Sequence, residues 1–470
     1  MKRFLVFSIS LMLFLNPHII TNGCAGEWEP DADYHLLFSP EILNATTFEP
    51  FFLWYGDLFY PYKNFPSDPS SDNLKEWMDY FNGKVNSSTL SKLIYKTTES
   101  QAQDYLDFYD GKPKKPGLNL NQNPDLNSNS VLVYVNMVQD RPFLEYLQFA
   151  VRCLPHVGGN GWDVPVRNVN AINQLIVEGN QKYAASKNDF LKLRYGYQLT
   201  RLAQYGGDNK KCIVTYDNQV EPLPVKSIVK YWAMSHKAGA LKNSGKRGEA
   251  IYLFSQVFKH CLSRRIEAFM SFKFIYDESQ MAEAYTFCKT PQDKNILLFM
   301  EGLMHTEINL TPLQSIYAAE PNSKELEILL AREIKKMEST VSGTEFATET
   351  LSNIVPFTDF VVSCAKAGNT YRPYFWNFSA AYLYYLENNM DEANKYLTMA
   401  KATPGTNDLF KDEIHVLEIL LKISSAPTVN KDLETSLLAD FKWLTDKKDY
   451  LNCDHVYPYL MDVLSKKFKM

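Results

Sequence analysis

The hydrophobic and polar positions of residues 371–403 follow a helical period on both sides of a short polar break. The first half, up to Leu386, is dominated by aromatic and other apolar residues. Residues 387–390 then interrupt the pattern, and from Asp391 onward the apolar side chains recur at intervals of three and four, which is typical of an amphipathic helix. We therefore expect two antiparallel helices here. One such pair leaves apolar surface uncovered, so similar pairs should stack on either side of it.

The same spacing occurs elsewhere in the chain. Counted from Ala381, small or apolar residues stand at +3, +12, +16 and +19, and the same offsets recur from Ala238. Small residues suit positions where two helices approach closely, and large ones suit positions where side chains interlock. The predicted packing positions are Ala238, Leu241, Ala250, Phe254, Val257, Ala381, Tyr384, Ala393, Leu397 and Ala400.

This pattern resembles the tetratricopeptide repeat. That family places small residues on both facing helices and an aromatic residue late in the second helix, often followed by proline. Trp376 and Pro404 each stand one residue earlier than the family's positions. The resemblance covers two copies and implies an all-α fold, an α-solenoid of stacked antiparallel helix pairs (TPR-like). An irregular helical array with two chance matches is the alternative, and it is also all-α.

Composition divides the chain into five parts. We expect a signal peptide at 1–23, an acidic tether and lead-in at 24–47, an N-terminal aromatic and helical segment at 48–110, a loop at 111–130 and a helical-repeat region at 131–470. The loop is rich in Gly, Pro and Asn and almost free of apolar residues. Asn73 and Glu76 have the spacing of a capping box, which predicts a helix start at Asn73.

Residues 48–62 hold eight aromatic side chains in fifteen positions, interrupted by Pro50, Gly56 and Pro61. The breaks exclude a long helix, so we expect an irregular, extended segment laid across helices. If exposed, it would form a binding patch that includes Trp54 and Tyr55, because contiguous apolar surface of that size is unusual on a monomer. The alternative is that these rings belong to the core.

The first residues have the pattern of an export signal. Lys2 and Arg3 precede a 12-residue, largely apolar run at 4–15, which is too short to span a membrane. The run ends at Gly23-Cys24, which resembles the lipobox of bacterial lipoproteins, although Thr21 and Asn22 depart from it. The resemblance implies a diacylglycerol on Cys24 and a protein anchored to the bacterial, most reasonably the outer, membrane, on either its periplasmic or its surface face. Ordinary secretory cleavage is the alternative.

Charge and cysteine content narrow the class further. Removing Lys2 and Arg3 from 49 basic residues leaves 47 against 54 acidic ones, a net charge of −7. This balance argues against a nucleic-acid partner. The six cysteines after Cys24 are widely spaced and form no CxxC pair, so we expect buried free thiols rather than disulfides.

A search for catalytic motifs finds no HExxH, no GxSxG and no zinc-type Cys/His spacing. His415 and Glu418, with Asp412 and Glu413 nearby, could present ligands to a metal, but a second histidine is missing and we expect a solvated charged face. We therefore expect no catalysis, no cofactor and no metal.

These observations favour an envelope lipoprotein whose helical repeats bind or scaffold a partner protein or peptide. Tyr374, Phe378 and Tyr385 share one face of the aromatic helix and are candidates to line a binding groove, with core packing as the alternative. A second hypothesis is glycan capture, because outer-membrane glycan-binding lipoproteins of the starch-utilisation type have a similar general build. A third, an all-helical hydrolase or lyase, has no supporting residues.

Overall fold

The computed structural model describes residues 37–38, 42–48, 51, 68–112, 129–158, 167–305, 307–341, 348–402, 405, 407–447 and 453–469. These residues form 21 α-helices and a few short 3-10 turns, and none of them lies in a β-strand. The prediction of an all-α protein is confirmed.

Eight helices precede the centre of the chain. Their bounds are α3 Pro69–Tyr80, α4 Ser87–Lys96, α5 Glu99–Tyr109, α6 Ser130–Met137, α7 Arg141–Cys153, α8 Val169–Ala185, α9 Asp189–Tyr205 and α10 Asn209–Gln219. The remaining helices are α11 Ile228–Asn243, α12 Arg247–His260, α13 Arg265–Lys273, α14 Glu278–Thr286, α15 Pro291–Met304, α16 Thr311–Ala319, α17 Lys324–Val341, α18 Thr348–Ala367, α19 Pro373–Leu386, α20 Met390–Ala402, α21 Asp408–Ser425, α22 Lys431–Asp446 and α23 Cys453–Lys469.

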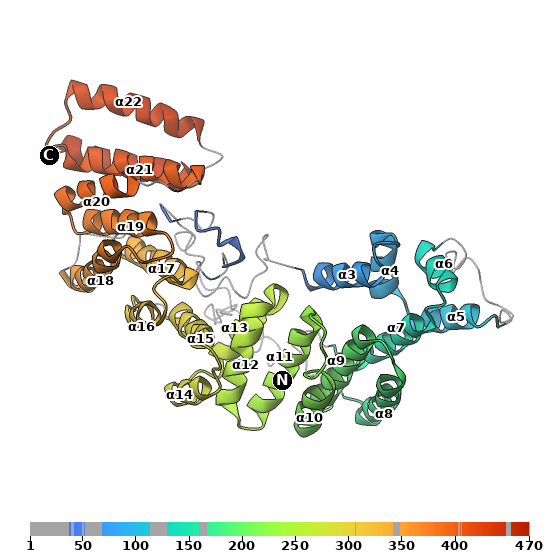
Figure 1. Ribbon diagram of the computed structural model, residues 1–470. Coiled ribbons are helices and arrows are strands. Elements are labelled where there is room, and N and C mark those ends of the chain that lie inside the picture. The colour runs from blue at the N-terminus through green and yellow to red at the C-terminus, as the bar shows by residue number, and fades with distance from the viewer. Residues whose placement is uncertain are drawn as a thin grey trace, which may run out of the picture.

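The helices follow one another along a curved row (Figure 1). Helices α3–α8 lie at one end of the row, α9–α13 near its middle, and α21 and α22 at the other end. Neighbours in sequence are mostly neighbours in space, with extensive packing of α9 on α10, α11 on α12 and α19 on α20. Short connections join the last two of these pairs, at residues 244–246 and 387–389, so each pair forms a helical hairpin.

The ten predicted packing positions lie in these two hairpins. All but Tyr384 are buried, and Tyr384 is partly buried with its ring 5.6 Å from that of Tyr396. Ala238 and Ala250 in the first hairpin, and Ala381 and Ala393 in the second, have no exposed surface. Small side chains therefore stand where the paired helices approach each other, as their spacing predicts.

Buried side chains gather in two large clusters. One joins α3–α10, so the helices on either side of the predicted loop at 111–130 share a core. The other extends from α11 to α23 and also contains residues near the N-terminus, from Leu37 to Phe51. The division of the core therefore falls near α10 and α11.

The predicted capping box at Asn73 is wrong. Helix α3 begins at Pro69, and its N-cap is Asp68, whose carboxylate accepts a hydrogen bond from the backbone N–H of Ser70. Asn73 and Glu76 lie inside the helix and make long-range contacts instead: both accept hydrogen bonds from Arg194 in α9. The spacing of Asn73 and Glu76 is that of a capping box, but both residues lie inside the helix. Asp68 followed by Pro69 is an equally good helix start and comes earlier in the chain.

Five cysteines of the described chain are free thiols. Cys153, Cys212, Cys261 and Cys364 are buried, and Cys288 is partly buried. Burial raises the pKa of Cys364 to about 11, so that thiol stays protonated at neutral pH. The prediction of buried free thiols holds for these residues. No helix within the described ranges has the length and apolar character needed to cross a membrane.

Candidate functional site

A segment from near the N-terminus lies against helices from the other end of the chain. We use the name N-terminal segment for its described residues, 37–38, 42–48 and 51. Figure 1 shows it in dark blue in the bend of the row, beside α17 and α19. Six of its side chains are buried, and they belong to the same cluster as α11–α23: Leu37, Phe38, Ile42, Leu43, Ala45 and Phe51. The part of the lead-in that the structure describes is therefore core and not tether.

Three arginines from separate helices hold the backbone of this segment. Arg372, the N-cap residue of α19, donates from Nη1 to the carbonyl oxygen of Ile42 at 2.9 Å. Arg265, the first residue of α13, donates to the carbonyl of Thr47 at 3.3 Å and to its hydroxyl at 3.1 Å.

Arg332 of α17 completes the set. Its Nε donates to the carbonyl of Phe51 at 3.0 Å, and its two Nη atoms donate to carbonyls at the C-terminal end of α15, those of Gly302, Leu303 and His305. One side chain thus caps a helix and fixes the segment. The three arginines together contact the segment at its start, middle and end.

Aromatic rings or a carboxylate contact two of these arginines. The guanidinium of Arg265 lies 4.0 Å from the ring centre of Phe48, and burial lowers its pKa to about 10. Arg372 donates from Nε to Glu327 at 2.6 Å. Burial raises the pKa of Glu327 to about 7, and the ion pair with Arg372 opposes that rise.

Phe38 fixes the beginning of the segment. Its backbone N–H donates to Oε2 of Glu413 in α21 at 2.8 Å. Its ring packs against Phe375, Phe378 and Tyr382 of α19, with ring centres 5.8, 5.0 and 5.5 Å away. The aromatic helix found by its pattern therefore contacts a segment near the N-terminus of the same chain.

Phe48 and Phe51 fix the other end. The ring of Phe51 lies 5.1 Å from Phe269 and 5.4 Å from Phe258, and the ring of Phe48 lies 5.5 Å from Phe299. For these two residues, the expectation of an aromatic segment laid across helices agrees with the structure. Phe51 is buried and Phe48 is partly buried, and both pack in the core, which was the alternative expectation for them.

The predicted binding residues do not form one exposed face. Phe378 has no exposed surface, so it lies in the core beneath Phe38. Tyr374 and Tyr385 are partly buried, and the Tyr385 hydroxyl lies 3.1 Å from that of Tyr459. Cys24, Trp54 and Tyr55 lie outside the described residues.

No protein-family model matches the chain, and neither a curated protein sequence nor a solved structure matches it. Function is therefore inferred from the geometry of the described residues.

The charged face expected around His415 is more buried than its sequence indicates. Glu413 is 3% exposed and accepts from Phe38, while Asp412 is paired with Lys447 at 2.8 Å. His415 stacks edge-on against Trp443, with ring centres 4.3 Å apart. Among the described residues, no group of three or more His, Cys, Asp or Glu side chains is placed to hold a metal ion.

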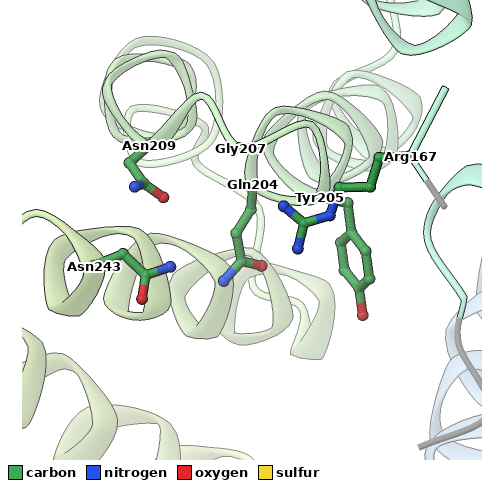
Figure 2. A pocket seen from close by; sticks show the side chains of 6 residues that line it. All are labelled: Arg167, Gln204, Tyr205, Gly207, Asn209 and Asn243. Atoms are coloured by element: carbon green, nitrogen blue, oxygen red, sulfur yellow. The ribbon is translucent and has the colours of Figure 1, made fainter. Parts of the chain in front are cut away.

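A polar pocket lies apart from the segment, where α9, α10 and α11 meet (Figure 2). Its volume is about 430 Å³, within the range typical of small-molecule sites. The lining residues are Arg167, Gln204, Tyr205, Gly207, Asn209 and Asn243. The sequence pattern does not indicate this pocket, because its residues come from the ends of α9, α10 and α11 and from the connections that precede α8 and α10, and they carry no motif.

Proposed function

We propose that the protein is a membrane-anchored helical-repeat scaffold of the cell envelope, an α-solenoid whose hairpins are tetratricopeptide-like. The observation that carries this proposal is the attachment of the N-terminal segment along the bend of the helical row. An anchor at Cys24 would be followed, only 13 residues later, by Leu37 in the core. Fully extended, 13 residues reach about 43–47 Å.

The anchor therefore holds the bend of the row close to the membrane. A force on the lipid would pass through the arginine contacts into α13, α17 and α19 and not into a single terminal helix. A scaffold needs this kind of attachment, because a partner bound to it must be kept at a defined distance from the membrane.

The same arrangement indicates where a partner binds. The N-terminal segment already covers the aromatic face of α19, so displacing it would expose Phe38, Ile42 and Phe51 to water. Each buried aromatic or aliphatic side chain contributes about 1.5–3 kcal/mol through burial. An envelope protein or peptide would therefore bind to exposed surfaces that the N-terminal segment does not occupy.

The anchor is tested by mass spectrometry of the mature N-terminus and by membrane fractionation of the wild type, Cys24→Ala and the control Cys288→Ala. We expect a diacylated N-terminus in the wild type and the control, and loss of Cys24→Ala from the membrane fraction. Protease treatment of intact cells then shows which face carries the protein. An unmodified wild-type N-terminus would rule out the anchor.

The scaffold role is tested by photo-crosslinking in cells from exposed positions on the outer surface. Val177 in α8 and Leu438 in α22 are 60% and 73% exposed and suit a photoreactive residue. We expect crosslinks to a defined envelope protein from at least one of them, and none from the buried control position Phe378. An anchored protein that gives no crosslink from either end of the row would contradict the scaffold role.

A further inference from the structure

The polar pocket of Figure 2 contains several hydrogen-bonding groups that the described protein does not use. The guanidinium of Arg167 is exposed, and no carboxylate of the described residues lies within ion-pair distance of it. Its planar fork of N–H donors is therefore free to bind a ligand. Such a fork matches the two oxygens of a carboxylate better than a point charge does.

Gln204 is held so that its amide nitrogen is available. Its Oε1 lies 2.5 Å from Nδ1 of His236. Burial lowers the pKa of His236 to about 3, so the ring is neutral, and because a carboxamide oxygen only accepts, Nδ1 carries the proton. The Gln204 NH₂ group consequently faces the other way, and Figure 2 shows it directed toward Asn243.

Asn209 supplies an acceptor. Its side-chain oxygen is buried and accepts no hydrogen bond from the described residues. An unsatisfied buried acceptor costs about 1–3 kcal/mol, and a donor brought by a ligand would remove that cost. Asn243 adds a second, exposed amide at the opposite wall.

Two glycines lie beside this arrangement. Gly207 has φ +83°, a conformation that other residues rarely adopt, and this backbone conformation accounts for the glycine there. At Gly239, an added Cβ would come within 2.3 Å of the Gln204 amide nitrogen. The nearby carboxylate of Asp208 is occupied, because it caps α10 and pairs with Lys211 at 3.2 Å.

We propose that this pocket binds a small carboxylate that also carries hydroxyl groups. Arg167 binds the carboxylate, and the amides of Gln204, Asn209 and Asn243 bind hydroxyls, since each amide offers a donor and an acceptor. One guanidinium matches the single charge of a carboxylate, whereas a phosphate carries about −1.5 to −2 at neutral pH. Sugar acids and open-chain hydroxy acids share this chemistry. The site is independent of the scaffold role proposed above.

The test is isothermal titration calorimetry of the full-length protein with five probes: D-glucuronate, D-gluconate, D-glucose, acetate and inorganic phosphate. We expect glucuronate or gluconate to bind at least tenfold more tightly than glucose, acetate and phosphate. Tighter binding of glucuronate assigns the site to a ring-form sugar acid, and tighter binding of gluconate assigns it to an open-chain hydroxy acid.

Variants separate the pocket from unspecific charge. Arg167→Gln should weaken binding of the preferred probe at least tenfold, and Asn243→Ala about threefold to tenfold. Lys366→Gln, which removes one exposed positive charge in α18, should leave binding unchanged. The proposal is overturned if neither hydroxylated carboxylate binds, if glucose or phosphate binds equally well, or if Arg167→Gln binds like the wild type while its circular dichroism is unaltered.

Discussion

The regions α3–α10 and α12–α21 each bury an arginine, Arg194 in the first and Arg265 in the second, but the two guanidiniums bind different partners. In the region α3–α10, Arg194 is 1% exposed and donates to the carboxylate of Glu76 at 3.0 Å, with Trp77 and Phe190 against its guanidinium. In the region α12–α21, Arg265 and Arg332 donate to backbone carbonyls of the N-terminal segment.

The two kinds of contact differ in how strongly they depend on the identity of the residues that make them. A contact between Arg194 and Glu76 depends on two particular side chains, so a change of either one breaks it. A contact with a carbonyl depends on the path of the backbone and only indirectly on the residue there. The first region is therefore stabilised by a buried charge pair. The second has a charge pair of its own, between Arg372 and Glu327, and in addition a segment of chain that passes among its helices.

The largest effect is expected from Phe38→Ala. Truncating this buried ring leaves a cavity against Phe375 and Phe378, which should cost about 3–5 kcal/mol. The measurement is urea denaturation combined with hydrogen exchange, and faster exchange should be confined to α12–α21. Phe274→Ala, at a position 69% exposed, is the control and should change stability by less than about 0.5 kcal/mol.

Arg194→Met should affect the other region. It leaves Glu76 without its buried partner, and breaking such a pair costs about 3–5 kcal/mol. Hydrogen exchange should become faster in α3–α10. The control Lys187→Met, at an exposed position, should exchange at rates close to those of the wild type. If hydrogen exchange in α12–α21 becomes faster to the same extent, the two regions unfold as one unit. That result would contradict the view that each region is stabilised by its own contacts.

The change in stability of α12–α21 with pH should be an effect of intermediate size. Because the pKa of Glu327 is raised to about 7 from an ordinary value near 4.5, the folded protein binds more protons between those values than the unfolded chain does. Stability of this region should therefore fall as pH rises from about 4.5 to 7, by roughly 1–3 kcal/mol. Glu327→Gln should show a flatter profile in urea denaturation at several pH values. An unchanged slope would assign the dependence to another group.

The smallest effect is expected from Arg372→Lys. Lysine keeps a positive charge beside Glu327 but lacks the N–H groups that reach the carbonyls of Ile42 and Leu43. The loss of these hydrogen bonds should lower the free energy of unfolding by about 1–2 kcal/mol. The matched control is Arg141→Lys, in a surface pair with Asp110, which should cost less than about 1 kcal/mol in the same denaturation experiment. Equal losses of stability in Arg372→Lys and Arg141→Lys would mean that the contacts with the carbonyls do not stabilise the protein.

The helices were predictable because their signals are local. The period of apolar residues placed the break between α19 and α20 to within one residue. The packing alanines were predictable for the same reason, since offsets of 12 to 19 residues remain within one hairpin.

The arginine contacts could not be predicted, because they join residues far apart in the chain. Arg265 binds a residue 218 positions away, Arg332 one 281 positions away and Arg372 one 330 positions away. A polar side chain at a helix start, such as Arg265 or Arg372, usually lies in solvent. Only the position of the N-terminal segment reveals that Arg265 is buried and that Arg372 is partly buried.

The backbone contacts of the three arginines have a consequence for how the sequence can change over time. Wherever a guanidinium binds a carbonyl oxygen, the residue that owns the carbonyl is free to be replaced, provided that its side chain points away from the core. Selection then acts on the arginines and on the segment's buried side chains: Leu37, Phe38, Ile42, Leu43, Ala45 and Phe51. The exposed positions between them, such as Asn44, can change while the route of the chain stays the same.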